Sequence, residues 1–113
     1  MVVAPPGLVA FKGYHAIRSL GEADRPGRYL LELQAAAPEP SFALVRWAAD
    51  RAVAGELAGI VTGPVTKAKW LAAGIPYPGH TDFLAAHAGA SRCAMFFWSP
   101  GLRVLLHTTH LVK

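Results

Sequence analysis

One segment of the sequence combines residue types and spacing that suit ligand binding. Residues 74–84 read Gly-Ile-Pro-Tyr-Pro-Gly-His-Thr-Asp-Phe-Leu. The two prolines stiffen a loop, and Gly79 lets the backbone pass close to a ligand. His80 and Thr81 then stand at the start of an expected helix, where the positive end of the helix dipole favours an anion. An imidazole and a hydroxyl there could bind a phosphate, a carboxylate or a substrate hydroxyl. The residues alone support a simpler alternative equally well, in which Thr81 only caps the helix and His80 has no role in binding.

A second candidate lies in residues 61–67, which read Val-Thr-Gly-Pro-Val-Thr-Lys. A strand that ends in a turn at Gly63 and then opens a helix would place backbone N–H groups and Lys67 at its carboxyl end. Open α/β sheets bind ligands at that end of their strands. Gly63 and Lys67 are therefore candidate ligand-loop residues. By themselves these residues favour the simpler alternative, an ordinary strand-to-helix connection with a surface lysine.

A third candidate is the pair His107 and His110 near the end of the sequence. Two histidines three apart match metal-ligand spacing on a helix. In a strand, however, positions three apart face opposite sides, so one ion would not reach both. His110 alone could be a ligand, but a lone histidine is more often structural. No spacing indicates a metal shared with His15, Asp82 or His87.

Nucleotide-binding fingerprints are missing from the sequence. Gly55, Gly59 and Gly63 are four residues apart, which matches neither the Gly-x-Gly-x-x-Gly turn nor the Gly-Lys-Ser/Thr phosphate loop. If the protein uses NAD, no fingerprint in these residues binds it.

Composition narrows the function class. The 113 residues suffice for one small domain, and 53% of them are hydrophobic. Only 16% are charged, below the roughly 25% usual in globular domains, which hints that some apolar surface packs against something further. The net charge of +4 is scattered along the chain, so nucleic-acid binding is not expected. The single cysteine, Cys93, cannot form an internal disulfide, and no apolar window is long enough to span a membrane. A cytoplasmic protein without a membrane partner is expected.

The pattern of apolar residues and breakers predicts the elements that would position these candidates. A helix begins after Ser41 as N-cap and stops before Gly59. A short buried strand follows at 60–62, then helices at 65–73 and 81–88, each ended by a glycine. Strands at 93–98 and 102–107 form a hairpin around a Ser-Pro-Gly turn. Earlier in the chain, 29–33 is a strand or the start of a helix, and 1–27 is mostly irregular with a short strand at 8–11. The order predicts an α/β fold with a mixed sheet flanked by helices.

Taken together, the three segments resemble the 4-hydroxythreonine-4-phosphate dehydrogenase family of vitamin B6 biosynthesis. The resemblance is carried by residues 60–65 with Lys67, by 73–84 and by 108–111. It covers roughly 48–111 well and the first forty residues loosely. The chain is accordingly interpreted as a single partial domain, 1–113, in which 1–40 is irregular and divergent and 41–113 is the family-like core.

The resemblance implies a fold similar to isocitrate and isopropylmalate dehydrogenases and a homodimer with its active site between subunits. Such enzymes use NAD and a divalent metal (Zn, Mg or Co) to oxidise 4-phosphooxy-L-threonine, and loss of CO2 then gives 3-amino-2-oxopropyl phosphate. By position in the motifs, His80 and Thr81 resemble the substrate-binding pair, and His110 resembles one of three histidine metal ligands. The resemblance assigns no catalytic residue to this chain.

Family members are much longer than this chain, and the resemblance places their other metal histidines and their phosphate-binding basic residues beyond these motifs. One histidine cannot hold a catalytic metal, since three protein ligands are usual. The isolated chain is therefore expected to have negligible dehydrogenase activity. Two alternatives remain open: a paralogous dehydrogenase of a phosphorylated four-carbon sugar acid, and a noncatalytic remnant that acts as an interaction module.

Overall fold

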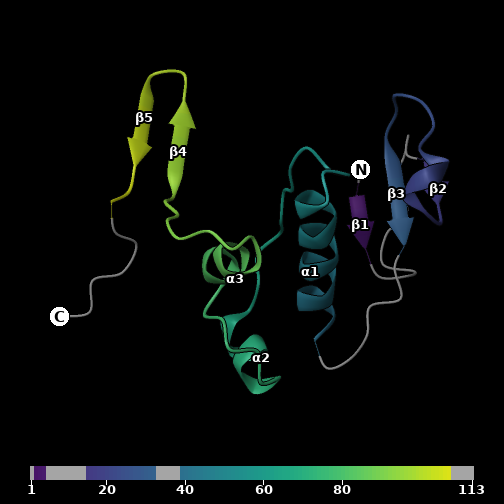
Figure 1. Ribbon diagram of the computed structural model, residues 1–113. Coiled ribbons are helices and arrows are strands. Elements are labelled where there is room, and N and C mark those ends of the chain that lie inside the picture. Colours follow the sequence, from purple (N-terminus) through teal and green to yellow (C-terminus); the bar gives the residue numbers. More distant parts are fainter. Residues whose placement is uncertain (1, 5–14, 33–38, 108–113) are drawn as a thin grey trace.

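The computed structural model describes residues 2–4, 15–32 and 39–107 of the chain. Within these ranges a small parallel sheet lies at one end of the molecule, the helices lie in the middle, and a β-hairpin stands at the other end (Figure 1). The radius of gyration is 16.0 Å, whereas a compact domain of this length would have about 13 Å. The structure is therefore more expanded than a compact domain of this length, with principal extents of 48, 39 and 26 Å.

The parallel sheet consists of β1 (Val2–Ala4), β2 (His15–Ile17) and β3 (Tyr29–Glu32), in the order β1-β3-β2. A short 3-10 helix, η1 (Leu20–Glu22), lies in the connection from β2 to β3. The central strand carries a small core of its own, because Tyr29 and Leu31 are both buried. The Tyr29 hydroxyl donates a hydrogen bond to the carbonyl oxygen of Arg25, 2.7 Å away, which closes the turn before β3.

Helix α1 (Pro40–Val53) contributes to two cores at once. Proline is well placed at the first helical position, where no N–H bond is lost, and Glu39 caps the helix by accepting a hydrogen bond from Ser41 N at 3.2 Å. Val45 and Ala49, four residues apart and therefore on one face, pack against the helices that follow. Trp47 lies on the opposite face and packs against the core of the parallel sheet.

Two short helices, α2 (Lys67–Ala72) and α3 (His80–His87), complete the larger core. Its buried members are Val45, Ala49, Trp70, Ile75 and Phe83. Phe42 makes edge-to-face contacts with Trp70 and Phe83 at centroid distances of 5.1 and 4.9 Å, a geometry that aromatic rings favour.

Gly74 ends α2 in the left-handed backbone region, with φ of 73°. Its N–H donates to Leu71 O, and Ile75 N donates to Trp70 O. This is the Schellman pattern, which satisfies the last carbonyls of a helix. It also turns Ile75 back into the core beside Trp70.

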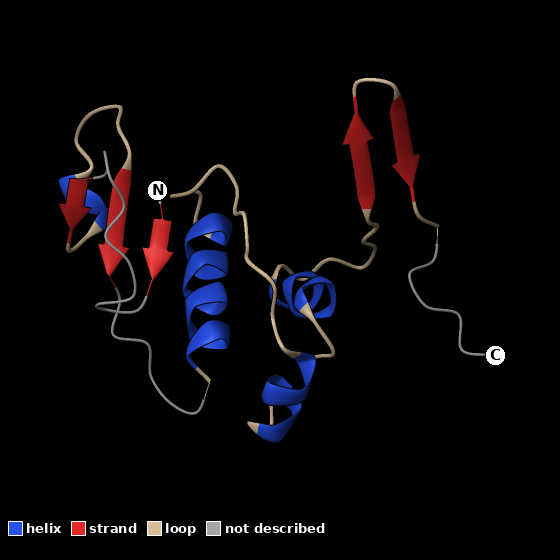
Figure 2. Cartoon of the chain, turned by 180° about the vertical axis from the view of Figure 1, so that it is seen from behind, coloured by secondary structure: helices blue, strands red, loops and turns tan. Residues whose placement is uncertain are grey.

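The hairpin pairs β4 (Phe96–Ser99) with β5 (Leu102–Leu105) in antiparallel register, with Phe97 opposite Val104. The Ser99 hydroxyl braces the turn by accepting from Leu102 N and donating to Leu102 O, both at 3.1 Å. Both views show the hairpin apart from the helices (Figure 2). Its large apolar side chains are more than half exposed: Phe96, Phe97, Trp98, Leu102 and Leu105. Because neighbouring residues in a strand point to opposite faces, both faces of the hairpin are apolar.

The α/β class is confirmed, but the expected single mixed sheet is wrong. The described residues form two separate sheets, one wholly parallel and one wholly antiparallel. The predicted buried strand at 60–62 is also wrong: these residues lie outside any strand, and Val61 is fully exposed at 103%. A strand needs a neighbour for its N–H and C=O groups, and no described segment pairs with this one. Strands β1 and β2 were not predicted, and the expected strand at 8–11 lies outside the described residues.

Candidate functional site

His80 and Thr81 form the first turn of α3, as predicted. The N-cap is Gly79, which has no side chain to cap the helix, so Thr81 does not have the capping role that the sequence left open. The first hydrogen bond along the helix runs from Phe83 N to Gly79 O. The N–H groups of the preceding residues therefore have no acceptor within the helix, and they form the positive end that suits an anion. Asp82, in the same turn, supplies the opposing negative charge.

The His80 ring lies against Trp70. The ring centroids are 5.6 Å apart and the planes meet at 75°. Trp70 is 0% exposed and His80 is half-buried. The Nε2 atom of His80 is covered and has no hydrogen-bond partner among the residues that the structure describes. A covered imidazole nitrogen without a partner is unusual in a protein interior, and Arg51 Nε is the other covered side-chain atom without a partner among the described residues.

Trp70 is itself held by polar contacts that sequence reasoning missed. Its indole N–H donates to Ser41 Oγ at 3.0 Å, and the Ser41 hydroxyl donates to Glu39 Oε1 at 2.7 Å. The one available signal was chemical: a buried tryptophan needs an acceptor for its N–H. The identity of that acceptor is a tertiary fact, because Ser41 is 29 positions away in the sequence.

Of the two candidate ligand-loop residues, the structure brings Lys67 to the His80 turn. A Cβ built on Gly79 would lie 3.7 Å from Lys67 Cε, so the lysine side chain passes beside the residue that precedes His80. Gly63 does not join them. It is exposed, and no heavy atom lies within 4 Å of where its Cβ would be. The described part of the site thus consists of an imidazole, a hydroxyl, an ammonium group and the amino end of α3.

His110, the predicted metal ligand, lies outside the described residues. Among the residues described, no group of three or more His, Cys, Asp and Glu side chains could hold a metal ion. His87 pairs with a residue outside the site, since its Nε2 atom lies 2.8 Å from Asp50 Oδ1. His15 lies on the parallel sheet. The described residues by themselves therefore do not fit a metal.

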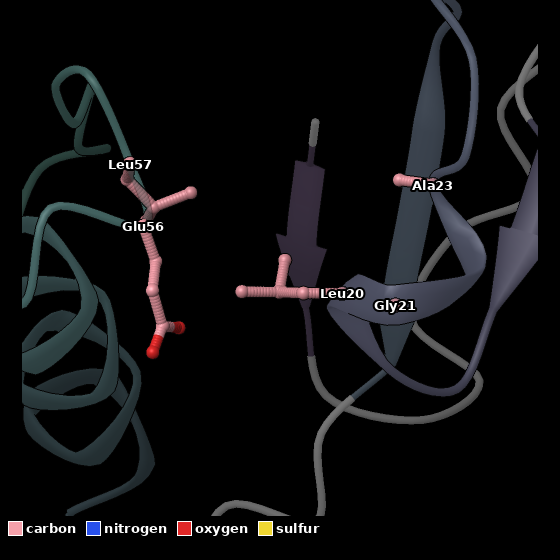
Figure 3. A pocket seen from close by; sticks show the side chains of 5 residues that line it. All are labelled: Leu20, Gly21, Ala23, Glu56 and Leu57. Atoms are coloured by element: carbon pink, nitrogen blue, oxygen red, sulfur yellow. The ribbon is translucent and has the colours of Figure 1, made fainter.

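An open hollow lies between η1 and the turn after α1 (Figure 3). It is lined by Leu20, Gly21, Ala23, Glu56 and Leu57. None of these belongs to the His80 turn, and Glu56 is the only charged side chain among them. The hollow therefore adds nothing to the candidate site.

In the described ranges, no helix is both long and apolar enough to cross a membrane.

Comparison with known proteins extends the agreement well beyond these motifs. The family model of "Pyridoxal phosphate biosynthetic protein PdxA" matches residues 16–112. This match includes 16–40, which the sequence motifs alone had left as divergent. It also includes His80, Thr81, Lys67 and His110.

Curated relatives agree with the family match. A 4-hydroxythreonine-4-phosphate dehydrogenase of Thermosynechococcus vestitus is 46% identical over 77 residues, 63% of this chain and 23% of the relative. The protein of the same name from Nostoc sp. is 44% identical over 85 residues, 68% of this chain and 23% of the relative. That of Xanthomonas oryzae pv. oryzae is 45% identical over 91 residues, 76% of this chain and 28% of the relative.

The chain thus spans about a quarter of the length of these relatives. The match to the family model nevertheless covers most of the chain, from within β2 to the residues after the hairpin. The chain belongs to the PdxA family of pyridoxal phosphate biosynthetic proteins.

Proposed function

We propose that this chain supplies part of the substrate site of a 4-hydroxythreonine-4-phosphate dehydrogenase, an oxidoreductase of vitamin B6 biosynthesis. The observation that carries the proposal is the family match over residues 16–112, together with relatives that all bear this enzyme's name. The reaction oxidises 4-phosphooxy-L-threonine with NAD to a 2-amino-3-oxo acid. Loss of CO2 from that acid gives 3-amino-2-oxopropyl phosphate.

His80, Thr81 and Lys67 bind the substrate in this proposal. The imidazole and the hydroxyl hydrogen-bond its polar groups, while the free N–H groups of α3 and the Lys67 ammonium attract its negative charge. The position of Lys67 beside Gly79 supports this grouping. Gly63 remains a candidate ligand-loop residue, because its exposed position leaves room for a ligand beside its backbone.

The complete enzyme would also require a nicotinamide cofactor and a divalent ion, Zn, Mg or Co, with His110 as one of three histidine ligands. Bound there, the ion would ease loss of the substrate hydroxyl proton. The described residues hold no metal-ligand set of their own. The 113-residue chain alone should have negligible dehydrogenase activity.

The proposed complete assembly has the isocitrate/isopropylmalate dehydrogenase-like fold and is a cytoplasmic homodimer with its active site between subunits. The exposed apolar faces of the hairpin support a larger structure, since soluble monomers rarely leave such surface uncovered. The length of the relatives supports it as well.

Titration of 4-phosphooxy-L-threonine into the 113-residue chain, followed by NMR, tests the substrate-binding proposal. We expect binding that perturbs His80 and Thr81, and a loss of affinity of about threefold to tenfold in Lys67→Ala. Lys69→Ala is the matched control, because Lys69 is also an exposed lysine on the same helix. No binding by the wild-type chain, or equal losses in the two lysine variants, would count against the site. Metal-dependent NAD reduction by the chain alone would overturn the proposed inactivity.

One alternative function is that of a paralogous dehydrogenase, which would oxidise a phosphorylated four-carbon sugar acid. This acid shares the phosphate but lacks the amino group, so a competition titration between the two compounds separates these functions. A noncatalytic interaction module is the other alternative, and the exposed hairpin is the observation that favours it. Hairpin-dependent association without any binding of 4-phosphooxy-L-threonine would support that alternative.

A further inference from the structure

The imidazole of His80 needs a constraint if it is to meet a ligand in one orientation. It stands at the free amino end of α3, directly after Gly79, which offers no side chain to hold it. The aromatic contact that the structure gives this ring is with Trp70. The orientation of the indole therefore decides which imidazole orientations are open.

The orientation of Trp70 is fixed from two sides. Phe42 packs on it edge to face at 5.1 Å. The indole N–H is satisfied by Ser41 Oγ at 3.0 Å. Because Trp70 is completely buried, water could not replace that acceptor if the indole turned.

Ser41 is in turn held by Glu39. Its hydroxyl proton is donated to Glu39 Oε1 at 2.7 Å, and its backbone N–H donates to the same oxygen at 3.2 Å. Because the hydroxyl proton of Ser41 is donated to the Glu39 carboxylate, a lone pair of Ser41 Oγ can accept the indole N–H of Trp70. The directions of the two hydrogen bonds are therefore linked, and they begin at the N-cap of α1.

We propose that Trp70 is a positioning residue for His80, and that the hydrogen-bonded series Glu39–Ser41–Trp70 sets the orientation of its imidazole. The N-terminus of α1 thereby controls a side chain at the N-terminus of α3. The functional consequence rests on the proposed function, since His80 matters only if it binds substrate. The effect of this series on the orientation of the His80 ring does not depend on the proposed function.

The test compares the imidazole 1H–13C NMR signals of His80 in the free 113-residue chain, assigned with His80→Gln. Ser41→Ala keeps both aromatic rings, and with them the ring currents that act on His80, and removes only the acceptor of the indole N–H. It should move the His80 ring signals, and Ser41→Thr, which restores a hydroxyl, should return them toward the wild-type positions. Ser99→Ala, which removes an exposed hydroxyl, and Trp47→Phe, in the other core, should leave them in place. The His15 signals, from the parallel sheet, verify that each variant is folded.

A purely structural role for Ser41 predicts a different result. Thermal stability would then fall in Ser41→Ala while the His80 ring signals stayed at their wild-type positions, and that result would overturn the proposal. Failure of Ser41→Thr to restore the signals would count against it too.

Binding of 4-phosphooxy-L-threonine then tests the consequence for function. Ser41→Ala should weaken binding by about threefold to tenfold, because loss of the hydrogen bond from Trp70 to Ser41 leaves the His80 ring less well oriented for the substrate. If the wild-type chain binds none of the compound, the proposed function fails, while the ring signals of the free chain still decide whether the series positions His80. If the wild-type chain binds it and Ser41→Ala binds equally well, positioning has no functional effect and the inference fails.

Discussion

His87 Nε2 lies 2.8 Å from Asp50 Oδ1, so the last turn of α3 is tied to the last turn of α1. The two side chains are 25% and 44% exposed. Solvent therefore weakens the interaction, and it should contribute modestly to the packing of the two helices.

A double-mutant cycle of Asp50→Ala and His87→Ala measures that contribution. We expect a coupling free energy of about 0.5 kcal/mol, as for partly exposed pairs. Urea unfolding of the four proteins at neutral pH provides the measurement. A coupling free energy above about 2 kcal/mol would mean that the pair behaves as a buried one.

Phe83 should be among the positions most sensitive to truncation. It is 3% exposed and contacts Phe42, Tyr77 and His87 through its ring. Phe83→Ala should cost about 3–5 kcal/mol, a large part of the roughly 5–15 kcal/mol by which domains are stable. Loss of the cooperative thermal transition, followed by circular dichroism, is the expected result. Leu71→Ala is the control: Leu71 is 77% exposed, and its replacement should change stability by less than about 0.5 kcal/mol.

Gly74 should not tolerate a side chain. Its φ of 73° belongs to the left-handed region, which costs other residues about 1–2 kcal/mol. Gly74→Ala should therefore lower the free energy of unfolding by about that amount in a urea titration. Gly63→Ala offers a matched control, since Gly63 has no positive φ and has open space around it. Equal effects of the two substitutions would contradict the argument from backbone conformation.

Local signals predicted all three helices, but the first was expected to continue up to Gly59 and instead ends at Val53. The glycine at 74 ended α2 as expected, and His80 and Thr81 do open α3. The start of α1 was misplaced because Ser41 is a common capping residue, whereas here Glu39 caps the helix and Ser41 accepts from Trp70. A preference for short polar caps could not anticipate a tertiary hydrogen bond.

Strands were harder to predict than helices, because each depends on a partner distant in sequence. Residues 96–99 and 102–105 lie close in sequence around a tight turn, and the hairpin was predicted. β2 is only three residues long, and what makes it a strand is its pairing with β3, which its own residues do not reveal. Residues 60–62 show the converse: their types suit a strand, but no described segment pairs with them.

In the candidate site, the motif located His80 and Thr81 at the start of a helix. The contacts of Trp70 and Lys67 with this turn depend on the tertiary structure and could not be predicted from the motif.

The hairpin should make the isolated chain associate. Its exposed aromatic residues cover both faces, and exposed apolar strands pair or stack readily. Light scattering should show a mass that rises with concentration. Phe97→Lys with Trp98→Glu should reduce that rise, whereas Val61→Lys, at a fully exposed apolar position outside the hairpin, should not. A wild-type chain that remains monomeric at all concentrations would contradict this expectation.

The position of α1 between two cores has a consequence for how the protein loses its structure. Val45 and Ala49 belong to the core with α2 and α3, and Trp47 belongs to the core of the parallel sheet. Melting of α1 would therefore expose part of both cores at once. In native-state hydrogen exchange, backbone amides of β3 and α3 should then share one opening reaction, and the two small cores should behave as a single cooperative unit.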